Sequence, residues 1–197
     1  FENSVYGTSW EECYSCGLNF QQDIMCEISF AQPDIYACDG YRLPTTAEWE
    51  YFARAGATGD FSTVASSTGE NIVPGNETSC DSSELDLGSY LEDYAWFCIN
   101  NNRAVGTKNV AQKDASPWGL FDIYGNVREW THDDTSSINI SGENPTTLSP
   151  NNLKRLVRGG SFDSSMSSMS NGFKTSQDAS SATYRTGVRF IRSAFSE

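Results

Sequence analysis

Histidine is almost absent from this chain, and basic residues are scarce. Of 197 residues, one is histidine, and 13 lysines and arginines stand against 26 aspartates and glutamates, which leaves a formal net charge of −13. Such a field repels phosphate backbones and anionic lipids, so we expect neither a nucleic-acid partner nor binding to a membrane surface. The single histidine also excludes a metal centre built from histidines.

Long apolar runs are missing as well. No run approaches the ~20 residues that a transmembrane helix needs, and the chain opens at Phe1 with no visible signal peptide. Aromatic residues, in contrast, make up 13% of the sequence, which argues against a disordered chain. The length suits one large domain, so we expect a single domain over residues 1–197.

Cysteine is present in an even number, and four of the six cysteines lie close together. The six are Cys13, Cys16, Cys26, Cys38, Cys80 and Cys98. Zinc is the alternative, because Cys13-x-x-Cys16 has the spacing of half a zinc ribbon, but the second half is missing. The spacings favour disulfides, with our expected pairs Cys16–Cys26, Cys13–Cys38 and Cys80–Cys98. Disulfides imply an oxidising location (secreted, cell-surface or periplasmic) and an export signal that has been removed.

The clearest secondary-structure signal is a helix that begins after Thr45. Thr45 can cap this helix, and Glu48 can complete a capping box. Trp49, Phe52 and Ala53 have the spacing of a buried helix face. Gly56 stands where the end of a helix favours a left-handed residue.

Elsewhere the pattern predicts a loop-rich chain with few helices. Residues 1–40 read as an irregular, disulfide-rich segment with a short strand-like run over Met25–Phe30. Residues 57–90 and 133–152 are rich in small polar residues and predict surface loops. Strands are expected over Leu156–Phe162, where two glycines bend the chain, and over Gly187–Arg192.

Four blocks of sequence resemble the formylglycine-generating-enzyme (sulfatase-modifying factor) family. They are Gly40–Tyr51 (GYRLPTTAEWEY), Trp118–Trp130 (WGLFDIYGNVREW), Arg155–Phe162 (RLVRGGSF) and Gly187–Phe190 (GVRF). The resemblance covers about residues 36–192, and the cysteine-rich opening is similar to exported bacterial members. It implies a C-type-lectin-like α+β fold, irregular and loop-rich, with few helices and short antiparallel strands. The strands and helix with which the family begins have no counterpart here, which suggests a processed piece.

The resemblance also implies how the family performs catalysis, and here the chain departs from it. Active members bind copper through two cysteines that follow the Gly-Gly-Ser motif. The matching positions hold Ser164 and Met169, and no cysteine lies beyond Cys98. We therefore expect no copper and no catalytic residue.

A calcium site is implied in the block Trp118–Trp130. By resemblance the ligands are the Asp122 side chain, the Gly125 and Val127 carbonyls and the Glu129 carboxylate, which are the hard oxygens that Ca²⁺ prefers. In the alternative interpretation, Asp122 caps a turn and Glu129 pairs with an arginine such as Arg128.

The segment from Asp163 to Thr175 matches the active face of the family, which carries the binding residues in receptor-binding relatives. Small polar residues and interspersed apolar ones can form an adaptable binding face for a protein or glycan ligand. Our candidates are Asp163, Ser164, Met166, Met169, Asn171, Phe173 and Lys174, with the methionines and Phe173 as apolar anchors. The alternative is a solvated linker on a structural domain.

Two further interpretations concern the remaining charged residues of these blocks. His132 lies beside Asp133 and Asp134, but no activated nucleophile is recognisable near it, so we expect a solvated loop histidine. Buried arginines of such folds usually bridge carbonyls and carboxylates, so we assign Arg42, Arg158 and Arg189 structural roles.

Three functions follow from the sequence. The first is a non-catalytic, secreted, disulfide-bonded and calcium-stabilised module that binds a protein or glycan or assembles with neighbouring subunits. The second is a formylglycine-generating-type oxidase that acts on a protein cysteine. The third is a structural subunit of an extracellular assembly.

Overall fold

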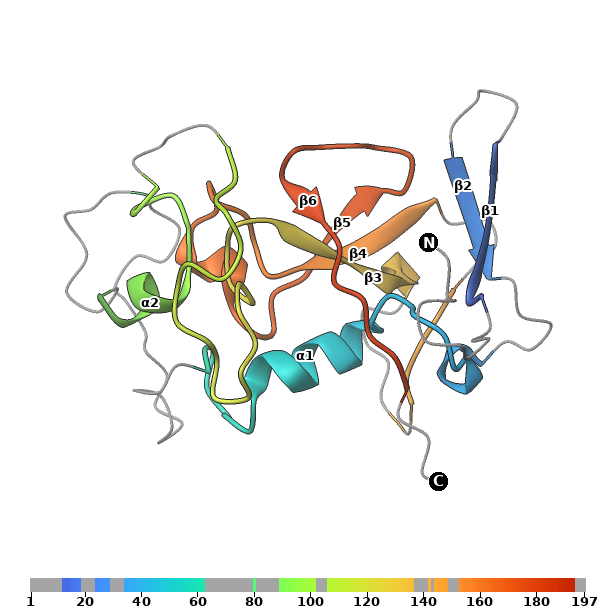
Figure 1. The fold of residues 1–197 in the computed structure, drawn as a ribbon, viewed down its shortest axis with the longest axis horizontal. Helices are drawn as coiled ribbons and strands as arrows, with labels where there is room; N and C mark the ends of the chain where they lie inside the picture. The colour runs from blue at the N-terminus through green and yellow to red at the C-terminus, as the bar shows by residue number, and fades with distance from the viewer. Residues whose placement is uncertain are drawn as a thin grey trace.

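In the computed structural model of this protein, a small mixed sheet forms the centre of the molecule (Figure 1). The structure describes residues 12–18, 24–28, 34–62, 80, 89–101, 106–136, 142, 144–148 and 153–193. The sheet has the strand order β5-β4-β3-β6, with β3 at Arg128–Asp134, β4 at Lys154–Arg158, β5 at Thr175–Asp178 and β6 at Thr186–Gly187. Strand β4 is antiparallel to both β3 and β5, whereas β6 runs parallel to β3. The predicted loop-rich α+β fold with short strands is confirmed.

Helix α1, Thr46–Arg54, packs below this sheet (Figure 1) and begins as the sequence predicts. The Thr45 side chain accepts a hydrogen bond from the Glu48 amide, and the Glu48 carboxylate accepts one from the Thr45 amide, which completes the capping box. The end differs slightly from the prediction, because Ala55 is already left-handed at φ 44° and Gly56 follows at φ 87°. Two consecutive left-handed residues turn the chain away from the helix axis.

The main core lies between α1 and the loops that cover it. Trp49 and Ala53 are fully buried there, as predicted, and Phe52 packs against them. The other buried members are Phe61, Leu91, Ala95, Phe97, Ile123, Tyr124, Met166 and Met169. Helix α2, Ser89–Tyr94, delivers Leu91 and leads into Ala95 and Phe97. Met166 and Met169 are the ends of a 3₁₀ turn, η5.

The N-terminal part is more regular than predicted. Strands β1, Tyr14–Leu18, and β2, Ile24–Ile28, form an antiparallel hairpin, and a short 3₁₀ helix, η1, follows at Ile35–Ala37. The predicted strand-like run, Met25–Phe30, starts one residue and ends two residues later than β2, and the sequence did not predict β1. Its sequence, YSCGL, does alternate apolar and small residues, but it is only five residues long and its Ser15 and Gly17 are more typical of turns than of strands.

The late strands also differ in extent from the prediction. β4 ends at Arg158, and Gly159, at φ 85°, makes the expected bend; a side chain there would contact the Ile123 carbonyl at 2.9 Å. The closing strand is much shorter than expected, since β6 covers two residues and Ile191 adds one antiparallel bridge to Arg42. Strand β3 reaches Asp134, inside the loop predicted over residues 133–152.

Candidate functional site

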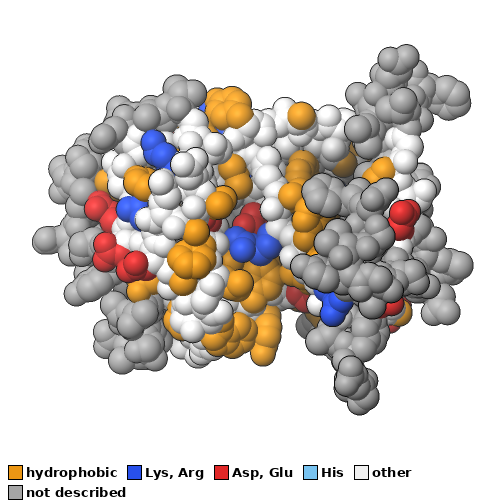
Figure 2. Space-filling model, in the orientation of Figure 1, with side chains coloured by type: hydrophobic (Ala, Val, Ile, Leu, Met, Phe, Trp, Pro, Cys, Tyr) orange, Lys and Arg blue, Asp and Glu red, His pale blue; other side chains and the backbone are white. Residues whose placement is uncertain are grey.

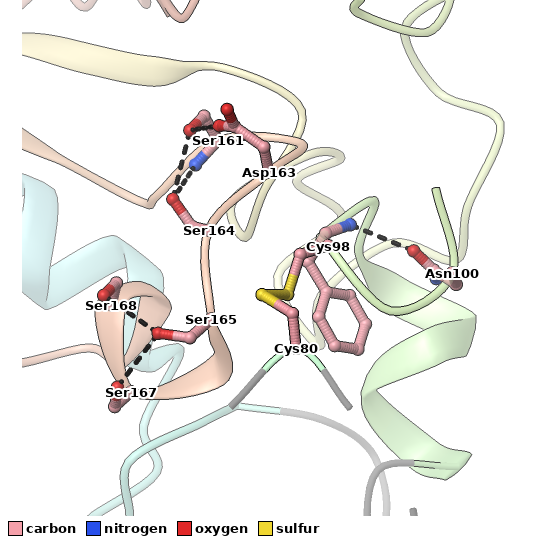
Figure 3. The surroundings of a disulfide bond; sticks show 10 residues. Cys80, Cys98, Asn100, Ser161, Asp163, Ser164, Ser165, Ser167 and Ser168 are labelled. Atoms are coloured by element: carbon pink, nitrogen blue, oxygen red, sulfur yellow. Dashed lines mark hydrogen bonds between the residues drawn. A yellow bond between two sulfur atoms is a disulfide. The ribbon is translucent and has the colours of Figure 1, made fainter. Parts of the chain in front are cut away.

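The segment after Gly160, where the sequence resemblance places two copper cysteines, is hydrogen-bonded to its own chain at several points. The Ser164 hydroxyl accepts a hydrogen bond from the Ser161 amide at 2.9 Å and lies 3.0 Å from the Ser161 hydroxyl. The Ser164 carbonyl accepts a hydrogen bond from the Cys98 amide at 3.1 Å. Figure 3 shows the Cys80–Cys98 disulfide beside this serine-rich segment. The nearby sulfur atoms are thus already bonded to each other.

The predicted binding face is largely wrong, because most of its residues are buried. Met169 and Asn171 are fully buried, Met166 is 5% exposed and Ser164 is 7% exposed. Met169 and Met166 belong to the main core and cannot act as surface anchors. Asn171 accepts a hydrogen bond from the Tyr124 hydroxyl at 2.7 Å and donates one to the Gly59 carbonyl at 3.1 Å.

The three-residue spacing of the two methionines could have revealed this. Residues three apart lie on the same face of a 3₁₀ turn, so one turn buries both. The surrounding serines hid the signal, because small polar residues in number are typical of loops. Of the predicted face, Phe173, Lys174 and Asp163 remain partly or well exposed, and Asp163 accepts a hydrogen bond from Arg185 Nε at 2.6 Å.

The Glu129 carboxylate, one of the predicted calcium ligands, is buried and already has two partners. Arg189 Nη2 donates to Oε1 at 2.6 Å, and Trp49 Nε1 donates to Oε2 at 2.7 Å. Arg189 Nη2 also donates to the Phe121 carbonyl at 2.9 Å. The arginine that pairs with Glu129 is therefore Arg189 rather than Arg128. No sequence pattern predicts the contact between Glu129 and Trp49.

Asp122, the second carboxylate of the predicted set, has one oxygen without a partner. Its backbone is left-handed at φ 54°, and its Oδ2 accepts a hydrogen bond from the Ala111 amide at 2.7 Å. Oδ1 is buried and has no hydrogen-bond partner among the described residues. Within the described ranges, no three histidine, cysteine or acidic side chains gather in a metal-binding group. A metal in this loop would need carbonyl ligands besides the two carboxylates.

Gly125 fixes the path of the predicted calcium loop. It has a left-handed backbone at φ 72°, and its amide donates to the Gly159 carbonyl at 2.8 Å. A Cβ atom at this position would lie 2.0 Å from the Trp96 carbonyl oxygen, so no other residue fits without moving the backbone. The next amide, of Asn126, donates to that same Trp96 carbonyl at 2.8 Å.

The prediction of a solvated His132 is wrong. The side chain is buried, and its Nδ1 lies 2.9 Å from the Tyr14 hydroxyl of strand β1. Burial lowers the pKa of His132 to about 4, and burial also raises the pKa of Tyr14 to about 12. The neighbouring Asp133 caps α1, because its Oδ2 accepts a hydrogen bond from the Thr46 amide at 2.5 Å. His132 therefore joins the hairpin to the domain.

The three motif arginines have the structural roles that the sequence predicts. Arg42 pairs with Glu48 at 2.7 Å, Arg158 with Glu50 at 2.9 Å and Arg189 with Glu129 at 2.6 Å. Arg158 also donates to the carbonyls of Asn171 and Phe173, at 2.9 and 3.0 Å. These bonds fasten the segment after η5 to the helix, in agreement with arginines that bridge carbonyls and carboxylates.

Two of the three predicted disulfides are present as predicted. Cys13 is bonded to Cys38, and Cys80 to Cys98. Cys16 is also disulfide-bonded, and in the hairpin register its Cα lies opposite that of Cys26. The Cys26 side chain lies outside the described part of the structure. Among the described residues, no helix combines the length and the apolar character needed to cross a bilayer.

Comparisons with known proteins agree with this architecture. Among solved structures, Treponema denticola variable protein 1 is 26% identical, with a TM-score of 0.61 over 92% of this chain and 62% of that one. PvdO from Pseudomonas aeruginosa is 20% identical, with a TM-score of 0.56 over 77% of this chain and 52% of its own. At that identity, the likeness to PvdO shows the shared fold alone.

Curated relatives share sequence as well. Chaperone protein LppX of Paenibacillus barcinonensis is 34% identical over 155 residues, which are 79% of this chain and 50% of the relative. The formylglycine-generating enzyme of Mycobacterium tuberculosis is 35% identical over 113 residues, 53% of this chain and 32% of the enzyme. The chain thus spans about half the length of the first relative and about a third of the second. Residues 3–194 match the sulfatase-modifying factor enzyme 1-like domain. The chain belongs to this sulfatase-modifying factor family.

Proposed function

We propose that this chain is a non-catalytic, secreted, disulfide-bonded binding or assembly module rather than a formylglycine-generating-type oxidase. The observation that carries the proposal is the state of the two positions where the family resemblance places copper thiolates. They hold Ser164 and Met169, and both side chains are buried. The Ser164 hydroxyl accepts a hydrogen bond from within the chain, and Met169 packs in the main core.

The chemistry of these two groups supports the proposal. Cu(I) is selected by soft ligands such as thiolates, and a neutral hydroxyl is a poor ligand for it. Ser164 Oγ is engaged with Ser161, and Met169 is enclosed by the main core. Cys98, which contacts Ser164 through its backbone, carries no free thiol because it is bonded to Cys80.

The relatives support binding as the function. The LppX relative is named a chaperone protein, a name that implies contact with other proteins. We propose that the ligand here is likewise a protein, with a glycan or neighbouring subunits as the other possibilities that the loops allow. The disulfides support a location in an oxidising compartment (secreted, at the cell surface or periplasmic).

We further propose that a calcium ion stabilises the loop between Asp122 and Glu129. The orphaned Oδ1 of Asp122 fits such an ion, since a buried carboxylate oxygen without a donor is otherwise unfavourable. The Gly125 and Val127 carbonyls and Glu129 would complete the ligand set. Arg189 and Trp49 together make four hydrogen bonds to the Glu129 oxygens, which use about four lone-pair sites, so a bound cation would take the place of one of the Arg189 contacts. The ion would supply charge compensation and order, not chemistry.

Copper binding and thiol oxidation together test the non-catalytic assignment. We would measure Cu(I) affinity by competition with a chromophoric chelator and oxygen uptake with a cysteine-containing peptide, with the Mycobacterium tuberculosis enzyme as positive control. The natural chain should bind no copper and consume no oxygen. A double variant, Ser164→Cys with Met169→Cys, should gain Cu(I) affinity if thiolates are what the site lacks. Copper-dependent oxygen uptake by the natural chain would establish the oxidase instead.

A further inference from the structure

Five large apolar side chains are exposed on α1, on the loop that begins at Trp118 and on either side of Arg189. They are Tyr51, Trp118, Phe121, Val188 and Phe190, each between 42% and 70% exposed. We call this set the aromatic surface. A contiguous exposed apolar patch on a soluble protein commonly marks an interaction site, whereas single exposed apolar residues do not.

Two contacts link the three segments that carry these residues. The rings of Tyr51, on α1, and Trp118 meet edge to face with centroids 5.1 Å apart. Arg189 donates to the Phe121 carbonyl at 2.9 Å, and Val188 and Phe190 flank Arg189 in the chain. The C-terminal segment, dark red in Figure 1, crosses the face turned to the viewer. Figure 2 shows hydrophobic side chains gathered around basic ones in the middle of that face.

The Arg189–Glu129 ion pair beside the aromatic surface carries no net charge of its own but retains hydrogen-bond donors. The charge of Arg189 is balanced by Glu129, which its Nε and Nη2 atoms contact. Its Nη1 atom donates to none of the described residues, and the side chain is 23% exposed. Two N–H groups are therefore available beside apolar rings. A neutral acceptor, such as the backbone carbonyl of an extended peptide, suits these donors better than an anion does.

The net charge of the whole chain further restricts the class of partner that this surface can bind. At a net charge of −13, long-range repulsion disfavours acidic partners and also a second copy of the same chain, while basic residues near the contact are attracted. We propose that the aromatic surface binds an extended apolar polypeptide segment flanked by basic residues. This rests on the proposed function as a binding module and names its partner class and its surface.

Short synthetic peptides test the proposal by calorimetric titration. One peptide carries apolar residues with lysine flanks, a second has the same apolar residues with glutamate flanks, and a third keeps the lysines but replaces the apolar residues by serine. We expect the first to bind, the second to bind at least about tenfold more weakly, and the third not to bind. Trp118→Ala and Phe190→Ser should each weaken the first peptide about tenfold, as truncation of an interface anchor does.

Leu153→Ala is the matched control, because Leu153 is 59% exposed and lies beside β5, at the other edge of the sheet from β6. It should leave peptide affinity unchanged, and thermal unfolding of all variants verifies that they fold. Equal affinity of the Trp118→Ala and natural chains, or a preference for the glutamate-flanked peptide, would overturn the proposal. So would a doubled mass in light scattering that Trp118→Ala abolishes, or glycan binding at this surface in place of peptide binding. The copper and oxygen-uptake assays judge the proposed function independently of these results.

Discussion

Trp49 and Arg189 both donate hydrogen bonds to the carboxylate of Glu129, the indole to Oε2 and the guanidinium to Oε1. The helix, the central strand β3 and the C-terminal segment are thereby joined at a single buried group. Each of the three residues belongs to a different one of the sequence blocks that carry the family resemblance.

Glu129→Gln should destabilise the chain by roughly 3–5 kcal/mol, the usual result of leaving one charge of a buried pair without its partner. Denaturant unfolding measures this change. Asp163→Asn is the matched control, since it removes the ion pair with Arg185 that is more than one-third exposed on both sides. Exposed pairs contribute about 0–1 kcal/mol. Similar losses for both variants would contradict the central role of Glu129.

Met169→Ala should lower the free energy of unfolding by about 2–5 kcal/mol, because it empties a fully buried site in the core. Phe173→Ala, at a side chain that is 37% exposed, should change it far less. The same unfolding experiment compares the two. A small effect of Met169→Ala would mean that this methionine is not packed as the structure has it.

The lowered pKa of His132 predicts that the folded chain loses stability in acid. Its folded pKa of about 4 lies below the ordinary value of 6.5, so the unfolded chain binds the proton more readily. The free energy of unfolding should therefore contain the full contribution of neutral His132 above pH 6.5. It should fall as the pH drops toward about 4, by roughly 3 kcal/mol for this group. The groups that act on its charge are Asp133, Arg42, Arg155 and Glu48, with the Tyr14 hydroxyl in direct contact.

The matched measurement for His132 is the pH dependence of unfolding in the His132→Gln variant. Glutamine can still contact the Tyr14 hydroxyl but does not titrate, so the slope between pH 6.5 and 4 should flatten. An unchanged slope would assign the acid sensitivity to carboxylates elsewhere.

Chelation tests the calcium proposal. An ion that binds only the folded chain raises its stability by mass action, so a chelator should lower the melting temperature and added Ca²⁺ should restore it. Asp122→Asn should abolish the response to calcium. Asp163→Asn, which changes a carboxylate outside the loop, should retain it. If neither chelator nor calcium shifts the melting temperature, the proposal that calcium binds this loop is wrong.

Local rules explain the part of the fold that could be predicted from the sequence. The start of α1 follows from Thr45 and Glu48, which need only residues three apart, and the bend after Arg158 follows from two adjacent glycines. The arginine roles followed from the general behaviour of buried guanidinium groups, although their individual partners did not. The two disulfides confirm pairs chosen from spacing and count.

The errors share one physical cause, which is that burial depends on contacts between distant segments. His132 looks like a solvated loop residue until β1 covers it with Tyr14. Met166 and Met169 look like loop residues until α1 and the loop around Tyr124 pack against them. The aromatic surface was missed for the same reason, because its residues come from segments that are far apart in the sequence.

The Arg42–Ile191 bridge, in which each amide donates to the other residue's carbonyl at 2.9 Å, has a consequence for the order of folding. It closes a loop that contains α1, α2 and the whole four-stranded sheet. Contacts between such distant residues form slowly, because chain entropy must be lost before they are made. Helix α1 and the β3–β4 pairing can form earlier, so the bridge belongs to the last stage. A chain that is still emerging from a ribosome or a translocation pore cannot complete it until Ile191 has appeared.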